Sequence, residues 1–197
     1  MSDGVTRELL AKFVPLDDDV WEERFNPTER VLEIRVDTSR EGEGELPDRL
    51  NMISWLDPSD AVVTREFRLE MEEMEKEEGY AGAKDMQHMF SINGRAMDMS
   101  RIDEEVTKGD IEIWRVTRDE MDHPFHVHGT SFQILSQNGR PPAPEDRGWK
   151  DTVNVGWGWT ELIVKFDHEA SEEFPYMYHC HILEHEDGGM MGQFTVQ

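Results

Sequence analysis

Cysteine is nearly absent from this chain of 197 residues, because Cys180 is the only one. A single cysteine excludes a disulfide within the chain, so the thiol is a buried packing residue, a reactive group or a metal ligand. The sequence also lacks any run of 18 apolar residues, and we therefore expect no membrane-spanning helix.

Positive charge is scarce as well, since 20 Lys and Arg face 44 Asp and Glu, a formal net charge of −24. Such a charge repels nucleic acid phosphates and anionic membrane surfaces, so we expect neither as a partner. The opening MSDGVTREL lacks the charged and apolar regions of a secretory signal. This leaves two readings: the chain stays in the cytoplasm, or its natural N-terminus is missing.

The length suits one full domain with an additional piece. Residues 1–49 contain one clear strand candidate, VLEIRV at residues 31–36, which the acidic run DTSREGEGELPDRL follows. That run is typical of a linker. The charged run EMEEMEKEE, residues 70–78, is either an acidic loop or a solvated helix.

From residue 50 onward, apolar residues alternate with polar ones at the period of a half-buried strand. A tight hairpin is indicated where MFSINGRAM turns at Asn93-Gly94. The strand candidates are AVVTREFRLEM (61–71), IEIWRV (111–116), HPFHVHGTSFQIL (123–135), ELIVKF (161–166) and QFTV (193–196). Strands separated by Gly and Pro turns favour an all-β fold, an antiparallel sandwich.

Six of the eight histidines fall into two clusters, HPFHVH at residues 123–128 and YHCHILEH at residues 178–185. A scattered set of core or surface histidines would not be sorted in this way, so the clusters indicate metal binding. The remaining two, His88 and His168, stand alone and are expected on the surface. The clustered histidines are His123, His126, His128, His179, His181 and His185.

Side chains alternate along a strand, which predicts metal sites on two opposite faces. His126 and His128 point one way together, as do His179 and His181, while Cys180 points the other way. Four imidazoles are more than one metal needs, so this face suggests a multinuclear site. An electron taken at Cys180 would cross to it through roughly three residues, on the order of 10 Å.

On the opposite face, Cys180 is joined by His185, and by Met190 beyond a tight bend at Gly188-Gly189. His123 completes a set of two imidazoles, one thiolate and one weak thioether. That set is typical of a blue-copper electron-transfer site. Zinc is the alternative occupant of the same ligands, although it has no use for an axial methionine.

The segments HPFHVHGTSFQIL, GWKDTVNV and HCHILEHEDGGMMGQFTV resemble the C-terminal cupredoxin domain of the multicopper oxidases, nearest to the bacterial laccase and cuprous-oxidase branch. The resemblance covers about residues 50–197 and implies a cupredoxin-like Greek-key β-sandwich. It further implies that residues 1–49 are a remnant of a preceding cupredoxin domain plus an acidic linker.

The resemblance also assigns copper ligands by motif match. It implies a type 1 copper and part of a trinuclear site that holds a type 2 copper and a type 3 pair. The implied ligands are His123, Cys180, His185 and Met190 for type 1 copper, His126 for type 2, and His128, His179 and His181 for type 3.

Further roles follow from the same resemblance. Glu186 stands where relatives pass protons to the cluster, with a solvent-facing glutamate as the alternative. Asp119 and Met121 resemble the pair that binds cuprous substrate, although Lys76 near the place of another acid leaves cuprous specificity open. Asp151 either orients a ligand by hydrogen bonding or stabilises a turn.

Members of this family build the trinuclear cluster from eight histidines, half of them in an N-terminal domain, and this chain has no third H-x-H pair. The resemblance implies electron transfer from a phenolic or Cu(I) donor to a cluster, with oxygen as acceptor. Completion of the cluster would need the missing N-terminal part or another subunit. The alternative is a free-standing electron-transfer or copper-binding cupredoxin without oxygen-reducing activity.

Overall fold

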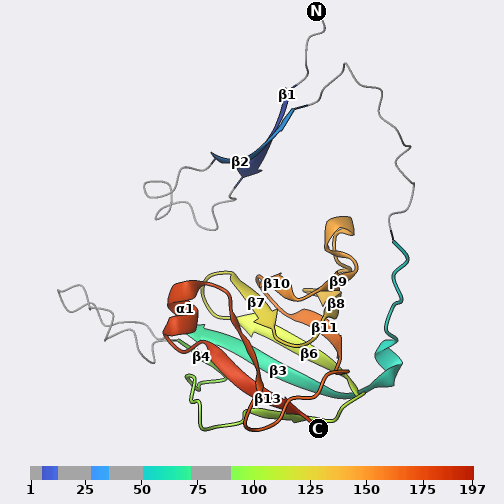
Figure 1. The fold of residues 1–197 in the computed structure, drawn as a ribbon, viewed down its shortest axis with the longest axis vertical. Coiled ribbons are helices and arrows are strands. Elements are labelled where there is room, and N and C mark those ends of the chain that lie inside the picture. Colours follow the sequence, from blue (N-terminus) through green and yellow to red (C-terminus); the bar gives the residue numbers. More distant parts are fainter. Residues whose placement is uncertain (1–5, 13–27, 36–50, 72–89) are drawn as a thin grey trace, which may run out of the picture. The chain divides into compact units, whose positions relative to one another are not determined.

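The computed structural model describes residues 6–12, 28–35, 51–71 and 90–197 (Figure 1). The chain divides into two compact units, Met1–Met52 and Ile53–Gln197. In the first unit, β1 (Thr6–Lys12) pairs antiparallel with β2 (Thr28–Arg35), which contains most of the strand predicted at residues 31–36. The assignment of residues 1–49 to a remnant of another domain stays a prediction.

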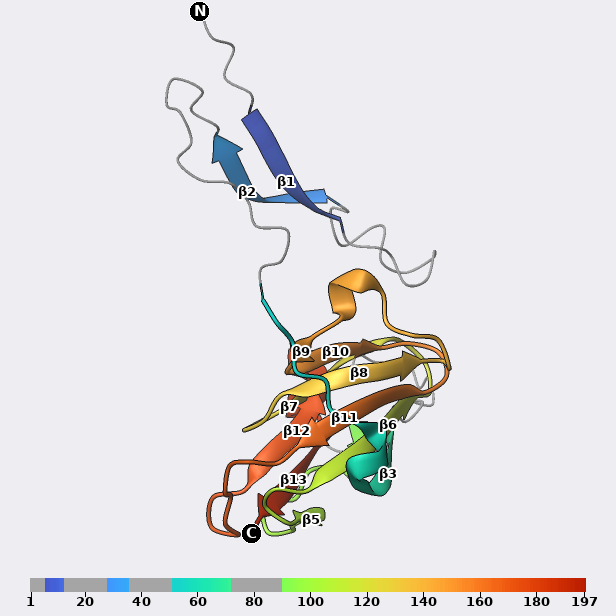
Figure 2. The same ribbon diagram turned by 90° about the vertical axis from the view of Figure 1, so that its right-hand side faces the viewer.

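The second unit consists of two sheets, whose strands Figure 2 shows from a second direction. The five-stranded sheet has the order β10 (Thr152–Val155), β7 (His123–Val127), β12 (Tyr176–Cys180), β13 (Met191–Val196) and β5 (Glu104–Val106). The six-stranded sheet has the order β4 (Phe90–Ile92), β3 (Ala61–Met71), β6 (Ile111–Arg118), β11 (Thr160–Lys165), β8 (Phe132–Gln137) and β9 (Trp149–Lys150). Short helices are the 3₁₀ turns η1 (Pro58–Asp60) and η2 (Pro144–Asp146), and α1 (Leu183–Asp187).

These sheets confirm the expected cupredoxin-like Greek-key β-sandwich. The pairing differs from the predicted antiparallel pattern at two places, because β3 pairs parallel with β6 and β13 parallel with β5. Parallel neighbours require a crossover instead of a hairpin, and both pairs join strands that other strands separate in the sequence. Local alternation carries no information about such distant pairing.

The core lies between the sheets and is built from aromatic rings of both. Phe67 and Trp114 of the six-stranded sheet have ring centroids 4.7 Å apart, and Phe67 meets Tyr178 of the other sheet at 4.9 Å. Trp114 also contacts Phe194 edge to face at 5.7 Å. All four side chains are buried, so they supply the apolar area that holds the sheets together.

A buried ionic cluster fastens one edge of the sandwich. Glu112, only 2% exposed, accepts hydrogen bonds from Arg65 Nε at 2.7 Å and from Trp114 Nε1 at 2.8 Å. Arg65 also donates to Glu104 on β5, which belongs to the opposite sheet. The guanidinium therefore ties the two sheets together through charged hydrogen bonds.

The hairpin predicted at Asn93-Gly94 is confirmed. Both residues have positive φ, 55° and 69°, as a type I′ turn requires. Ile92 and Arg95 exchange backbone hydrogen bonds across it, at 3.0 and 3.1 Å. Within the described ranges, no helix combines the length and apolar character needed to cross a membrane.

Candidate metal centre

Two neighbouring strands of the five-stranded sheet, β7 and β12, carry three of the clustered histidines, and the other three follow these strands in the chain. His179 lies opposite His126 in the antiparallel register, and Cys180 lies opposite Phe125. Paired residues share a face of a sheet and successive residues alternate, so the two imidazoles face one side and the thiol faces the other. Cys180 and Phe125 are fully buried inside the sandwich.

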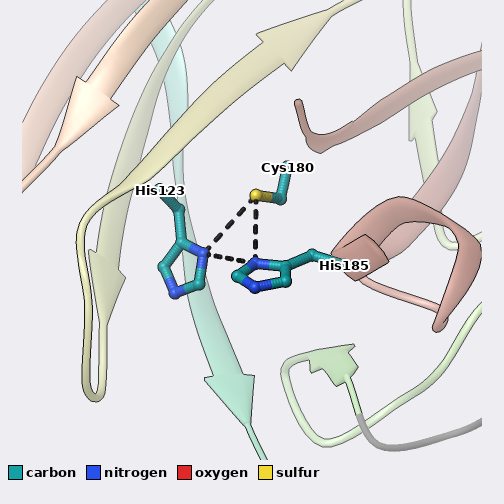
Figure 3. A group of neighbouring side chains, drawn as sticks. All are labelled: His123, Cys180 and His185. Atoms are coloured by element: carbon teal, nitrogen blue, oxygen red, sulfur yellow. Dashed lines mark hydrogen bonds between the residues drawn. The ribbon is translucent and has the colours of Figure 1, made fainter. Parts of the chain in front are cut away.

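On the inner face, Cys180 meets two histidines from different elements (Figure 3). His123 begins β7, Cys180 ends β12 and His185 lies on α1. The Sγ atom lies 3.4 Å from His123 Nδ1 and 3.5 Å from His185 Nδ1, and the two nitrogens are 3.1 Å apart. All three side chains are buried, so three donor atoms converge away from water.

The size of this triangle fits a metal ion. A point equally far from the three donor atoms lies about 1.9 Å from each, close to metal–nitrogen distances of about 2.0 Å and metal–sulfur distances of about 2.3 Å. Two imidazoles and one thiolate suit copper. His123, Cys180 and His185 therefore form a His-Cys-His group suited to type 1 copper.

Burial keeps these groups neutral in the metal-free protein. Desolvation raises the pKa of the Cys180 thiol to about 11, because the charged thiolate loses contact with water. The pKa of His123 is lowered to about 3, mainly by desolvation and to a smaller extent by the nearby His185 ring and Arg118. Burial also lowers the pKa of His185. Neutral imidazoles are ready to bind a metal, whereas the thiol must first lose its proton.

Met190 is fully buried beside this group. Its backbone carbonyl accepts from Cys180 N at 3.1 Å, and its N–H donates to His185 O at 2.9 Å. Met191 lies opposite His179 in the register, so alternation places Met190 on the same side as Cys180. The backbone register thus favours Met190 over Met191 as a neighbour of the sulfur.

His185 lies on a short helix, α1. The sequence predicted a tight bend at Gly188-Gly189 but no helix before it. The ring of Phe90 from β4 stacks on its imidazole, with centroids 4.5 Å apart and planes 22° apart. Phe90 was missed as a site residue, since it lies 95 positions from His185 and no spacing connects them. The only signal was its place in an apolar arm of the predicted hairpin.

The outer face gathers the other histidines. Ligand atoms of His126, His128 and His179 all lie within 4.8 Å of one another, and Nε2 of His128 is 3.1 Å from Nε2 of His179. The His181 ring borders the group, with its centroid 5.5 Å from that of His126. An open hollow of about 400 Å³ adjoins these imidazoles and is lined by His126, His128 and Tyr176 among others.

Backbone carbonyls orient two of these rings. His126 Nδ1 lies 2.8 Å from Asp151 O, and His179 Nδ1 lies 3.0 Å from Cys180 O. A carbonyl only accepts, so each Nδ1 carries the proton and each Nε2 is left to bind a metal. Asp151 therefore contacts His126 through its backbone, while its carboxylate accepts from Thr152.

The remaining predicted residues lie around these two groups. Glu186 Oε2 is 3.5 Å from His179 Nδ1. Asp119 accepts from Arg68 Nε at 2.7 Å, and Met121 is half-buried close by in the chain. His168 is exposed as expected, whereas His88 and Lys76 lie outside the described residues.

Comparison with known proteins gives a consistent picture. The family model described as multicopper oxidase matches residues 71–197. "Multicopper oxidase mco" of Staphylococcus aureus is 42% identical over 117 residues, which are 56% of this chain and 25% of that protein. "Cell division protein FtsP" of Escherichia coli is 45% identical over 105 residues, 53% of this chain and 22% of that protein.

Among solved structures, the chain is similar to the laccase-like multicopper oxidase CueO from an Ochrobactrum species. The two share 34% sequence identity with a TM-score of 0.77, over 98% of this chain and 42% of the other. That protein is described as having oxidase activity towards lignin model compounds and lignosulfonate. The chain spans about a quarter of the curated relatives that it matches.

Proposed function

Because this chain belongs to the multicopper oxidase family, we propose that residues 50–197 accept single electrons from a phenolic or Cu(I) donor and pass them to an oxygen-reducing copper cluster. The observation that carries the proposal is the triangle of His123, Cys180 and His185. Its donor atoms lie 3.1 to 3.5 Å apart in a buried site, directly behind a second group of imidazoles.

Bound copper would supply one-electron chemistry at the triangle by alternating between Cu(I) and Cu(II). The two imidazoles and the thiolate would hold it from three separate elements, so the site would keep its shape when the charge changes. Met190 would be an additional, weak sulfur ligand. Burial of all three donors excludes water, which would otherwise compete as a ligand.

The path between the two faces is a single peptide link. Cys180 is bonded to His179 and His181, and His179 faces the outer group. Strand β12 is held by β7 on one side and β13 on the other, so this link is rigid. An electron that enters at the thiolate would reach the outer imidazoles along the strand, without crossing solvent.

The outer group would provide half of a trinuclear site. We assign His126 to a type 2 copper and His128, His179 and His181 to a type 3 pair, with the other four histidines supplied by an N-terminal part or another subunit. Residues 1–49 are proposed as a remnant of the preceding domain with an acidic linker. The likeness to the laccase-like CueO supports this, because it extends over 98% of the chain.

Supporting roles are proposed for three residues. Glu186 lies 3.5 Å from His179 and would carry protons toward the cluster. Asp119 and Met121 precede His123 and would receive a cuprous donor. An ion pair with Arg68 would hold the Asp119 carboxylate in place for this role.

A free-standing cupredoxin that transfers electrons without reducing oxygen is the second candidate. The observation in its favour is that the sequence supplies only two H-x-H pairs. Both candidates share the type 1 copper, so they differ in the outer face alone.

Copper counting and oxygen uptake separate the two candidates. We expect the copper-loaded chain to show an intense blue band that Cys180→Ser abolishes and the control His168→Ala retains. Addition of a polypeptide with the two missing H-x-H pairs should raise the copper content to four and start oxygen uptake with a phenolic donor. A chain that stays at one copper and never consumes oxygen supports the cupredoxin, and a chain without a blue band refutes both.

A further inference from the structure

Arg118 is a buried charged residue that contacts the chain segment leading into His123. It ends β6, and its side chain is only 7% exposed. Its Nη2 donates to Asp122 Oδ1 at 2.6 Å, and its Nη1 donates to the carbonyl of Glu120. Asp122 directly precedes His123, so the ion pair places a guanidinium next to the segment that carries a metal-binding imidazole.

Two buried nitrogens in this region lack hydrogen-bond partners among the described residues. They are Arg118 Nε and His123 Nε2. A buried polar atom without a hydrogen-bond partner lowers the stability of the fold. Other interactions must offset this cost, or the unpaired atom serves a function. Here the unpaired Nε–H leaves one side of the guanidinium without a nearby acceptor to offset its positive charge.

Trp157 covers the guanidinium from outside. The centre of the guanidinium lies 4.8 Å from the centroid of the indole ring, although Trp157 itself is 76% exposed. The contact is a cation–π interaction, which gains strength when the cation is shielded from water. The indole thereby keeps water away from Arg118, and the electric field of the charge is screened less than at the surface.

The sign of the expected effect on the reduction potential follows from the charge of Arg118. A change from Cu(I) to Cu(II) would add one positive charge at the inner site. Arg118, which Asp122 holds next to the segment of His123, would repel this added charge, and its burial weakens the screening by water.

We propose that Arg118 is a positioning residue that raises the reduction potential of the type 1 copper, with Asp122 as its counter-charge and Trp157 as its cover. The proposal rests on the proposed function, since it requires copper at His123, Cys180 and His185. The residue touches neither donor nor metal. It sets how strongly the site pulls an electron from its donor.

The test is the reduction potential of the copper-loaded full chain, measured together with its blue band. Arg118→Gln should lower the potential, with a change of about tenfold in the Cu(II)/Cu(I) equilibrium, or ~59 mV for one electron. Asp122→Asn should raise it. Arg118→Lys should retain most of the original potential, because the charge remains. The position of the blue band should stay unchanged in all three.

Arg115 provides the matched control. It lies on the same strand, is 44% exposed and pairs with Glu161 at 2.9 Å. Arg115→Gln should leave the potential unchanged, because solvent and salt screen a surface charge. Trp157→Ala should lower the potential in part and make it depend on ionic strength.

The outcomes separate the proposals. Equal potentials in wild type, Arg118→Gln and Asp122→Asn would overturn the role of Arg118 while leaving the blue copper site intact. If Arg118→Gln and Asp122→Asn shifted the potential in the same direction and also displaced the blue band, the effect would be structural. That result would overturn the role of Arg118 as well. A wild-type chain that binds no blue copper would refute the proposed function and this inference together.

Discussion

The ring of Phe90 lies flat against the imidazole of His185, with centroids 4.5 Å apart, and Gly188 leaves the space that the phenyl ring occupies. A Cβ atom at residue 188 would overlap the Phe90 ring and lie 2.9 Å from Glu184 O. The position of a metal-binding ring thus depends on a glycine that binds nothing.

Gly188→Ala should therefore destabilise the chain by about 1–3 kcal/mol, the usual cost of overpacking a tight site. It should also weaken and shift the blue copper band, because Phe90 must move and His185 with it. Urea unfolding and absorption spectra measure the two effects. Gly156→Ala is the control, since its Cβ would meet only ordinary contacts of 3.7 Å or more. Wild-type behaviour of both variants would contradict this account.

Met190→Leu should keep the blue colour and raise the reduction potential, since loss of the thioether disfavours Cu(II). We expect a change on the order of tenfold in the redox equilibrium, ~59 mV. Voltammetry of the copper-loaded chain measures it. Met191→Leu is the matched control, because Met191 aligns with His179 instead of Cys180. A shift in the control alone would identify Met191 as the axial ligand.

Metal uptake at the inner site should release one proton at neutral pH. The Cys180 thiol, with a pKa of about 11, is protonated in the metal-free protein, whereas His123, with a pKa of about 3, is not. The thiolate is the metal-binding form, so affinity should rise about tenfold per pH unit between pH 7 and 9 and level off near pH 11.

Cobalt(II) is a suitable probe metal, because it binds without redox chemistry. Its thiolate absorption band measures the affinity at each pH, and the pH change in weak buffer measures the proton released on binding. Cys180→Ser should remove both signals. Affinity that is independent of pH in this range would show that the thiolate already exists in the metal-free protein.

Glu112→Ala should destabilise the chain by about 3 kcal/mol, because Arg65 would lose its buried partner and Trp114 its acceptor. The more exposed pair of Arg115 and Glu161 gives the comparison, and Glu161→Ala should cost at most about 1 kcal/mol. Urea unfolding of both variants measures the difference. Equal effects would mean that solvent already screens Arg65.

Local sequence patterns predict much of the fold and of the candidate site. Alternation along residues 111–116 predicts strand β6, although the buried residues at its start include Glu112 in place of Ile111 and Ile113. Asn93-Gly94 predicts the hairpin after β4, because few residues tolerate positive φ. The two faces of β12 follow from the same two-residue period. Each of these features depends on neighbours within a few positions, so the sequence displays it directly.

Contacts between segments far apart in the sequence could not be predicted from such local patterns. Phe90 on His185, Arg65 on Glu112 and Trp157 over Arg118 each join residues that lie 39 to 95 positions apart. The helix around His185 was also missed, since five residues are too few to show a helical period. These contacts arise from packing of whole sheets, which local spacing does not encode.

Strand β12 carries thiol and imidazole on adjacent residues, and its register against β7 is fixed. One residue gained or lost inside this strand would exchange the sides on which both groups stand, so it would disable both centres in one event. Substitutions can erode either centre alone, yet no change of length can reposition one and spare the other. The inner group around Cys180 and the outer group of imidazoles are therefore inherited as a unit, because adjacent residues of one strand belong to both.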